Sequence, residues 1–202
     1  MNSNSPAGMN LVDALTALNQ FRNQAVVIST MGAAREWPRI SNHPLDLVYV
    51  PSSMGQAPAL GLGLALACPE QRVIIINGDG CMLMNLGTLV TISAEAPSNF
   101  VLVVIENGVY EVTGRQPTAA SPSIRPVDSQ VDMVEMARAA GFKNAHRYRD
   151  LETWKTEAES VLQEEGPVFI CLECVPCSGD ASITSPGPMR ERLPRFQQAL
   201  TE

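Results

Sequence analysis

Four short runs of almost purely apolar residues do most to limit the folds open to this 202-residue chain. The runs are AVVIST (25–30), RVIIIN (72–77), FVLVVIEN (100–107) and PVFICLECV (167–175). Strands that are apolar on both sides are typical of parallel sheets covered by helices on both faces. Each run therefore predicts a buried strand, and LDLVYV (45–50) and a short segment near 145–148 predict two more.

The segments between these strands carry helical patterns or loop composition. We expect helices at 9–23, 83–95, 130–140, 151–164 and 189–200, a small-residue helix after a Ser/Gly loop within 52–67, and a glycine turn with a short helix that ends near Pro38. The Pro-, Ser- and Gly-rich segments 114–129 and 176–188 predict loops. Strands that alternate with helices predict an α/β, doubly wound, mainly parallel sheet with helices on both faces. Residues 1–8 are expected to form a flexible tail, and residues 9–202 a single domain.

Composition narrows the classes of partner. The net charge of -7 argues against nucleic acid or an anionic membrane surface as the main partner, although a local site can still hold a small anion. The chain has no 18-residue apolar run, and its first residues lack the basic and apolar regions of a secretory signal. Five cysteines, an odd number, favour reduced thiols. Together these features predict a cytoplasmic protein that does not span a membrane.

The triplet Gly78-Asp79-Gly80 follows directly on the strand expected at 72–77. Glycines permit a sharp turn and the close approach of a ligand to the backbone. A carboxylate here can bind a hard cation, and the amides of the helix expected to begin near Met82 can hold phosphate oxygens. The triplet therefore suits a magnesium–diphosphate ligand. An ordinary strand-to-helix turn with Asp79 as the helix cap is the alternative.

Asn107 lies at the end of the next expected strand. Residues 81–105 suffice for one helix and one strand, and such a right-handed crossover places the strand ends at 77 and 107 side by side. Because magnesium usually takes few ligands from protein, one carboxylate and one amide oxygen would serve. Asn107 is therefore a candidate second ligand, with a plain turn residue as the alternative.

The spacing of these two elements resembles a known motif. GDG (78–80), residues 81–105 and then EN (106–107) are similar to the thiamine diphosphate motif, in which GDG precedes a pair of asparagines. The stretch MNLGTLVTISAEAPSNFVLVVIENGVYEVTGRQPT (84–118) resembles the diphosphate-binding half of thiamine-dependent decarboxylases, above all those that act on sulfopyruvate and phosphonopyruvate. The resemblance covers residues 9–200.

The resemblance implies roles for particular residues. Magnesium would be bound by Asp79, the side chain of Asn107 and the backbone carbonyl of Val109. The residues implied to contact the diphosphate or the rest of the cofactor are Ser52, Ser53, Met54, Gly55, Gly78, Asp79, Gly80, Cys81, Met82, Asn107, Val109 and Tyr110. Met54 matches the bulky residue that holds the cofactor bent, with plain core packing as the alternative.

Three positions depart from the family pattern, and one of them is Arg115, which stands where similar decarboxylases often have glycine. Cys81 stands where the family often has serine, so a hydroxyl contact would become a thiol or backbone contact. Glu106 stands in place of the first asparagine, and the second is the usual metal ligand.

One part of the family's active site is missing. The glutamate that activates the cofactor lies on a separate pyrimidine-binding domain, for which this chain has no room. The resemblance therefore implies a β subunit of a 2-oxo acid decarboxylase, without a catalytic residue of its own, that works in a homo-dimer or hetero-oligomer with an α subunit carrying the glutamate. An acetolactate-synthase-like carboligase, a non-catalytic cofactor-binding module and a ligand-free nucleotide fold remain alternatives. A 2-oxo acid:ferredoxin oxidoreductase subunit is less favoured, because its multi-cysteine cluster motif is absent.

Several other patterns point to structure rather than to a second site. GLGLALA (61–67) follows a loop, not a strand, so close helix packing is favoured over dinucleotide binding. Cys171, Cys174 and Cys177 have the spacing of an iron–sulfur run, but residues three apart in a strand face opposite sides. His43 is expected to be a solvated loop residue, and His146 a structural residue in a strand. Arg115 either meets an anionic group or faces water.

Overall fold

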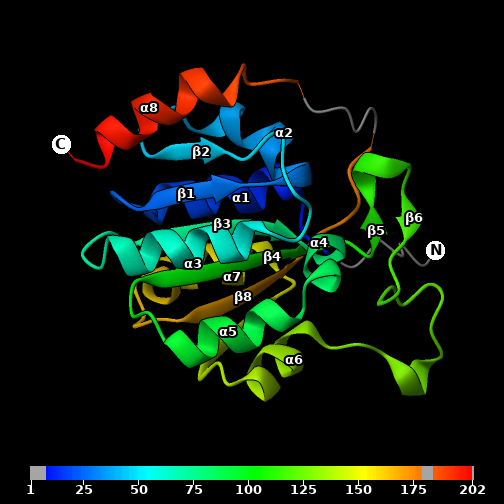
Figure 1. Cartoon of the computed structure of the whole chain (residues 1–202). Coiled ribbons are helices and arrows are strands. Elements are labelled where there is room, and N and C mark those ends of the chain that lie inside the picture. The colour runs from blue at the N-terminus through cyan, green and yellow to red at the C-terminus, as the bar shows by residue number, and fades with distance from the viewer. Residues whose placement is uncertain (1–7, 179–183, 202) are drawn as a thin grey trace.

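The molecule is built on a parallel sheet of six strands in the order β2-β1-β3-β4-β8-β7 (Figure 1). The structure is a computed structural model that describes residues 8–178 and 184–201. The strands are β1 (Val26–Ser29), β2 (Asp46–Val48), β3 (Val73–Gly78), β4 (Phe100–Glu106), β7 (Asn144–Tyr148) and β8 (Val168–Glu173). After β1 the chain forms β2 on one side of β1, and it then crosses back to form β3 on the other side. The predicted doubly wound α/β fold is therefore confirmed, with its topological switch between β1 and β3.

Helices cover both faces of the sheet (Figure 1). One face packs against α1 (Leu11–Phe21), α2 (Met31–Ile40) and α7 (Leu151–Leu162), and the other against α3 (Ala57–Ala67), α5 (Gly87–Glu95), α6 (Met133–Ala140) and α8 (Met189–Ala199). Alternate strand residues serve opposite faces: Ile74 and Ile76 belong to the first core, Val73 and Ile75 to the second. Because each strand is buried on both sides, its sequence is apolar throughout.

Two small elements lie beyond the carboxyl ends of the strands. The short helix α4 (Asp79–Met84) begins where β3 ends. A hairpin of β5 (Val109–Tyr110) and β6 (Gln116–Pro117), joined by the 3-10 turn η1 (Glu111–Thr113), projects from the same end of the sheet (Figure 1). A second 3-10 turn, η2 (Val127–Ser129), follows in the connection to α6.

The structure differs from the sequence expectations in three places. The single helix expected at 83–95 is two helices, because Asn85 ends α4 and its side-chain amide donates a hydrogen bond to the carbonyl of Gly55 (3.2 Å). The helix after the triplet begins at Asp79, not near Met82. The helix expected to end near Pro38 contains that residue and continues to Ile40.

The other boundaries shift by a few residues, and the loop expected at 114–129 includes β6 and η2. The expected tail at 1–8 lies outside the described residues except for Gly8. Across the described residues, none of the helices is long and apolar enough to cross a membrane.

Candidate functional site

A pocket opens at the topological switch, where β1, β3 and β4 end. It spans about 590 Å³, part of it open to solvent. Its walls come from the turn after β1 (30–33), the end of β3 with the start of α4 (77–81), and the hairpin (109–113), together with Leu11, Met54, Met84, Ile105 and Asn107. Ligands of open α/β sheets bind at such a position.

Asp79 lines this pocket and is only 3% exposed. One carboxylate oxygen accepts a hydrogen bond from the amide of Gly80 (2.7 Å) and the other from the amide of Gly108 (2.8 Å). β3 and β4 are neighbours, with Gly78 opposite Ile105, so the predicted approach of the two strand ends is confirmed. Burial raises the pKa of Asp79 to about 6, although both amides oppose that shift. A bound cation would offset the cost of burying this charge.

Asn107 shapes the loop that wraps around Asp79. Its side-chain oxygen accepts a hydrogen bond from the amide of Val109 (3.0 Å) and thereby forms the turn into the hairpin. An amide oxygen has two lone pairs, so this bond leaves one for a metal. The same atom can therefore serve both as a turn former and as a ligand.

The hairpin closes over α4 through Tyr110. A Cβ atom placed on Gly80 would lie 2.5 Å from the Tyr110 ring, so the ring rests directly on the glycine backbone. At Gly78, no described residue other than its two chain neighbours has an atom within 4 Å of the corresponding position, and Gly78 lines the pocket. The first glycine of the triplet thus leaves room for a ligand, and the second makes room for Tyr110.

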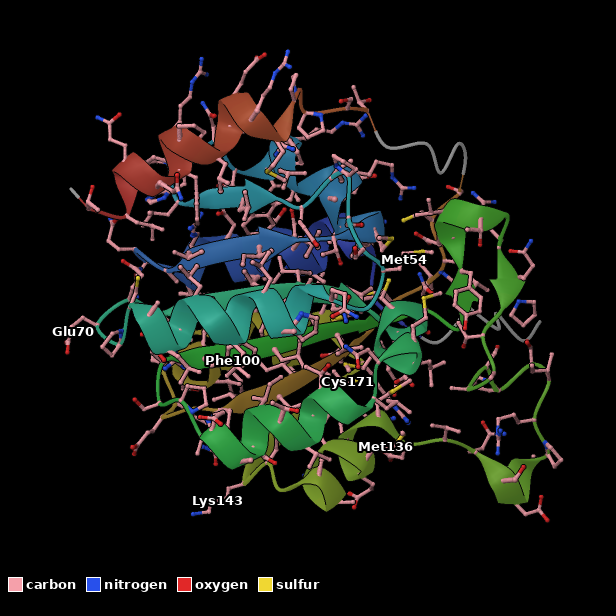
Figure 2. The ribbon with its side chains drawn as sticks, viewed as in Figure 1. Met54, Glu70, Phe100, Met136, Lys143 and Cys171 are labelled. Carbon is pink, nitrogen blue, oxygen red and sulfur yellow. The ribbon has the colours of Figure 1, made fainter. Side chains whose placement is uncertain are left out.

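Met54 is placed at the rim of the pocket, 49% exposed, beside the carboxyl end of the sheet (Figure 2). Gly55 follows with φ +81° and lies against the carbonyl of Cys81 and the side chains of Asn85 and Met84. This packing of Gly55 fixes the loop before α3 against α4. Burial also raises the pKa of the Cys81 thiol.

The structure brings eight of the predicted site residues to the pocket wall: Met54, Gly78, Asp79, Gly80, Cys81, Asn107, Val109 and Tyr110. The other four are not among the lining residues. Ser52 and Ser53 precede Met54 in its loop, Gly55 is buried against α4, and the side chain of Met82 lies in the core.

One wall was missed by the sequence reasoning, which treated residues 31–40 only as a turn and short helix. Thr30, Met31 and Gly32 line the pocket at the start of α2. Thr30 does not cap this helix, and its hydroxyl instead donates to the carbonyl of Ile76 (3.2 Å). Amides in the first helical turn have no acceptor within the helix and favour an anion. The available signal was Gly32, which lies two residues beyond the buried strand expected at 25–30.

Met31 takes a strained backbone conformation at this wall. Its φ is +50°, in the left-handed region that residues other than glycine seldom adopt. Such strain is concentrated at functional sites, where the surrounding structure holds it in place. Glu111, a buried carboxylate on the hairpin, also lines the pocket and was missed.

A second, more polar depression lies beyond β4, β8 and β7. Arg147 pairs with Glu173 (2.7 Å) and with Asp132 (2.5 Å), and Arg149 pairs with Glu173 (2.8 Å). Burial raises the pKa of Glu106, which accepts a hydrogen bond from the Cys171 thiol (3.1 Å). Carboxylates thus already balance the arginine charges here.

The remaining sequence candidates have structural partners. Within residues 8–178 and 184–201, no three His, Cys, Asp or Glu side chains are placed to hold a metal. His43 accepts a hydrogen bond from the amide of Leu45 (3.2 Å), and His146 lies 2.8 Å from Glu164. Arg115 is exposed in the hairpin turn with φ +61°. A Cβ on Gly61 would lie 2.1 Å from Ile75, so this glycine permits the close approach of α3 to β3.

The chain also matches known proteins. Residues 26–172 match the family model described as thiamine pyrophosphate enzyme, C-terminal TPP binding domain. Phosphonopyruvate decarboxylase of Streptomyces hygroscopicus is 34% identical over 179 residues, which is 88% of this chain and 42% of that protein. Sulfopyruvate decarboxylase subunit beta of Methanothermobacter thermautotrophicus is 34% identical over 173 residues, 85% of each chain. The chain thus spans about two fifths of the phosphonopyruvate decarboxylases that it matches, at 42% and 39%.

Solved structures share the fold at low identity. A 2-oxoglutarate:ferredoxin oxidoreductase from Magnetococcus marinus superposes with a TM-score of 0.66 and 14% identity, over 98% of this chain and 78% of that one. A thiamine diphosphate-dependent 4-hydroxybenzoylformate decarboxylase from Rhodococcus jostii gives 0.66 and 18%, over 89% and 35%. With the family model matched across most of the sheet, the chain belongs to the thiamine pyrophosphate enzymes, as their C-terminal TPP-binding domain.

Proposed function

We propose that this chain is the thiamine diphosphate- and magnesium-binding subunit of a 2-oxo acid decarboxylase, and that a partner subunit supplies the catalytic glutamate. The observation that carries the proposal is the buried carboxylate of Asp79, held by two backbone amides at the switch point beside Asn107. The names of the relatives favour a sulfopyruvate- or phosphonopyruvate-type substrate.

The donor set fits a magnesium–diphosphate group. Asp79, the Asn107 side chain and the Val109 carbonyl offer hard oxygen atoms, and magnesium takes its other ligands from phosphate and water. The open space at Gly78 admits a ligand close to the backbone. The uncapped start of α2 offers amides to an anion on the opposite wall.

The chain's own residues would bind and orient the cofactor. Asp79, Asn107 and Val109 would hold the metal, and the backbone at Gly78, Gly80 and Cys81 would line the diphosphate. Met54 would contact the cofactor at the rim, where it is half exposed. When bound, thiamine diphosphate would supply a nucleophilic carbon and an electron sink for the release of carbon dioxide from a 2-oxo acid.

The surface beside the pocket supports the need for a partner. Helix α3, APALGLGLALA, contains no charged residue and is apolar on all sides. Such a composition is typical of a helix that is buried on every side. Leu60 and Leu66 on α3 are 41% and 49% exposed, and Val90 on the neighbouring α5 is 58% exposed. Met54 and Met84, each 49% exposed, join this surface to the pocket rim. A subunit that covers this α3–α5 face would also complete the pocket.

Turnover in a reconstituted pair tests the proposal. The chain would be coexpressed with a pyrimidine-binding subunit encoded beside it, and carbon dioxide release measured from sulfopyruvate, phosphonopyruvate and pyruvate. We expect release that requires both chains, thiamine diphosphate and magnesium, and that Asp79→Ala abolishes. Copurification without turnover of any 2-oxo acid would contradict decarboxylation, and acetolactate formed from pyruvate would identify a carboligase instead.

A further inference from the structure

Glu111 is a buried carboxylate that neither the family motif nor the proposed metal site uses. It lies in the η1 turn of the hairpin, is 7% exposed and lines the pocket. A negative charge on the wall of a pocket for an anionic diphosphate opposes ligand binding unless another charge balances it. The position of Glu111 therefore requires an explanation in its contacts.

Those contacts join three segments that are distant in the sequence. One carboxylate oxygen accepts a hydrogen bond from the amide of Cys177, in the chain after β8 (2.7 Å). The other oxygen lies 3.9 Å from a guanidinium nitrogen of Arg35 on α2. The Arg35 and Glu111 side chains are 8% and 5% exposed, so the pair is shielded from water.

Gly32 shows how closely the hairpin packs on the start of α2. A Cβ atom on Gly32 would lie 2.8 Å from the same oxygen of Glu111 that faces Arg35. Any larger residue at position 32 would push the carboxylate away from Arg35. The absence of a side chain there is thus what lets Glu111 reach across the pocket wall.

We propose that Glu111 is a positioning residue that ties the hairpin to α2 and to the chain after β8, and so holds Val109 and Tyr110 in the geometry that binds the metal and diphosphate. The inference rests on the proposed function and extends it to a residue outside the ligand set. Arg35, which also pairs with Glu36, offsets part of the charge of Glu111, and the hairpin in turn places the Tyr110 ring on Gly80. Removing the carboxylate would loosen the hairpin without deleting any metal ligand.

Two measurements on the full chain test this role. Hydrogen exchange reports the order of residues 109–117 without any ligand, and calorimetric titration with thiamine diphosphate and MgCl₂ reports affinity. We expect Glu111→Ala to speed exchange in the hairpin and to weaken binding about tenfold or more, the range typical of groups that hold metal ligands in place. Glu111→Gln, which keeps an acceptor for the Cys177 amide, should fall between Ala and the wild type.

Glu36→Gln is the matched control. Glu36 is also a shielded carboxylate bonded to Arg35 (2.6 Å, 12% exposed side chain), but it does not line the pocket. Its loss should lower stability and leave hairpin exchange and ligand affinity close to wild type. Equal loss of affinity in Glu36→Gln and Glu111→Ala would overturn the positioning role.

A double-mutant cycle with Gly32 separates the tie from a direct clash with ligand. Gly32→Ala should weaken binding in the wild type, because it displaces the carboxylate, and should cost little more once Glu111→Ala is present. Additive losses would overturn the inference, as would wild-type affinity and wild-type hairpin exchange in Glu111→Ala. Failure of the wild type to bind both alone and together with its partner subunit would overturn the proposed function, whereas the exchange data would still decide whether the tie exists.

Discussion

Asp79 and Met31, which both line the pocket, are held in states that lower the stability of the fold. Asp79 is buried among backbone amides, including those of Gly80 and Gly108, and burial raises its pKa to about 6. Met31 is held at φ +50° on the facing wall. Groups kept in unfavourable states at one place are typical of a functional site rather than of a core.

The Asp79 charge should make the metal-free protein less stable as pH rises. The folded pKa of about 6 lies above the ordinary 3.8, so the folded state holds this proton more tightly than the unfolded state does. The contribution of Asp79 to stability is thus greatest at low pH and is lost between pH 4 and pH 7, by about 3 kcal/mol for a pKa difference of about two.

Urea unfolding at several pH values, with EDTA, measures this contribution as the difference between wild type and Asp79→Asn. The difference should become less favourable to the wild type toward pH 7, and excess magnesium should reverse part of the trend. Unfolding free energies that run parallel for the two proteins across this range would contradict the buried charge.

The two glycines of the triplet should respond differently to alanine. Gly80→Ala would put a methyl group 2.5 Å from the Tyr110 ring, and such overpacking costs about 1–3 kcal/mol. Gly78→Ala meets open space and should leave the melting temperature nearly unchanged while reducing cofactor binding. Thermal melts and ligand titrations of both variants check this pattern, and the reverse assignment would refute it.

At the scale of elements, strand composition predicted the sheet well because burial on both faces leaves a continuous apolar signal. The crossover between β3 and β4 was predictable for the same reason, since the segment between the two runs is long enough for only one pass across the sheet face. The break between α4 and α5 was not predicted, because residues 83–95 keep a helical pattern while Asn85 turns to bond Gly55. The hairpin was missed because its strands are two residues long.

Some of the site residues were also predictable from the sequence, and others were not. Asp79 and Asn107 were found because each directly follows a buried strand and together they form a spaced motif. Thr30 and Glu111 were missed because their importance depends on which segments meet in space. Arg35 and Glu111 meet only after β1 and β4 come to flank β3.

Helix α3 offers a matched pair of glycines for testing element packing. A Cβ on Gly61 would lie 2.1 Å from Ile75 of β3, so Gly61→Ala should force α3 away from the sheet at a cost of about 1–3 kcal/mol. At Gly63, two positions on, a Cβ would meet no atom within 4 Å in the described part of the chain outside the helix's own nearby backbone. Gly63→Ala should therefore stabilise the isolated chain by up to about 1 kcal/mol through helix propensity. Urea unfolding of the two variants should give opposite signs, and equal effects would contradict the packing account.

At the scale of the whole molecule, we propose that a partner covers a surface made of the α3–α5 face and the pocket rim. Apolar interface cores lose affinity strongly when a charge is buried in them. Leu60→Glu and Val90→Glu should therefore abolish copurification of the partner subunit while the chain alone stays folded. Thr156→Glu, on the exposed side of α7, is the control and should copurify normally. Loss of the complex in the control, or its survival in both face variants, would place the interface elsewhere.

The central claim is that Asp79 and Asn107 bind thiamine diphosphate through magnesium, and calorimetric titration tests it most directly. Wild-type protein titrated with thiamine diphosphate should bind with magnesium present and lose most of that affinity in EDTA. Asp79→Asn should weaken the magnesium-dependent binding by about tenfold or more while its circular dichroism spectrum stays unchanged. Equal binding with and without magnesium, or wild-type affinity in Asp79→Asn, would contradict the account.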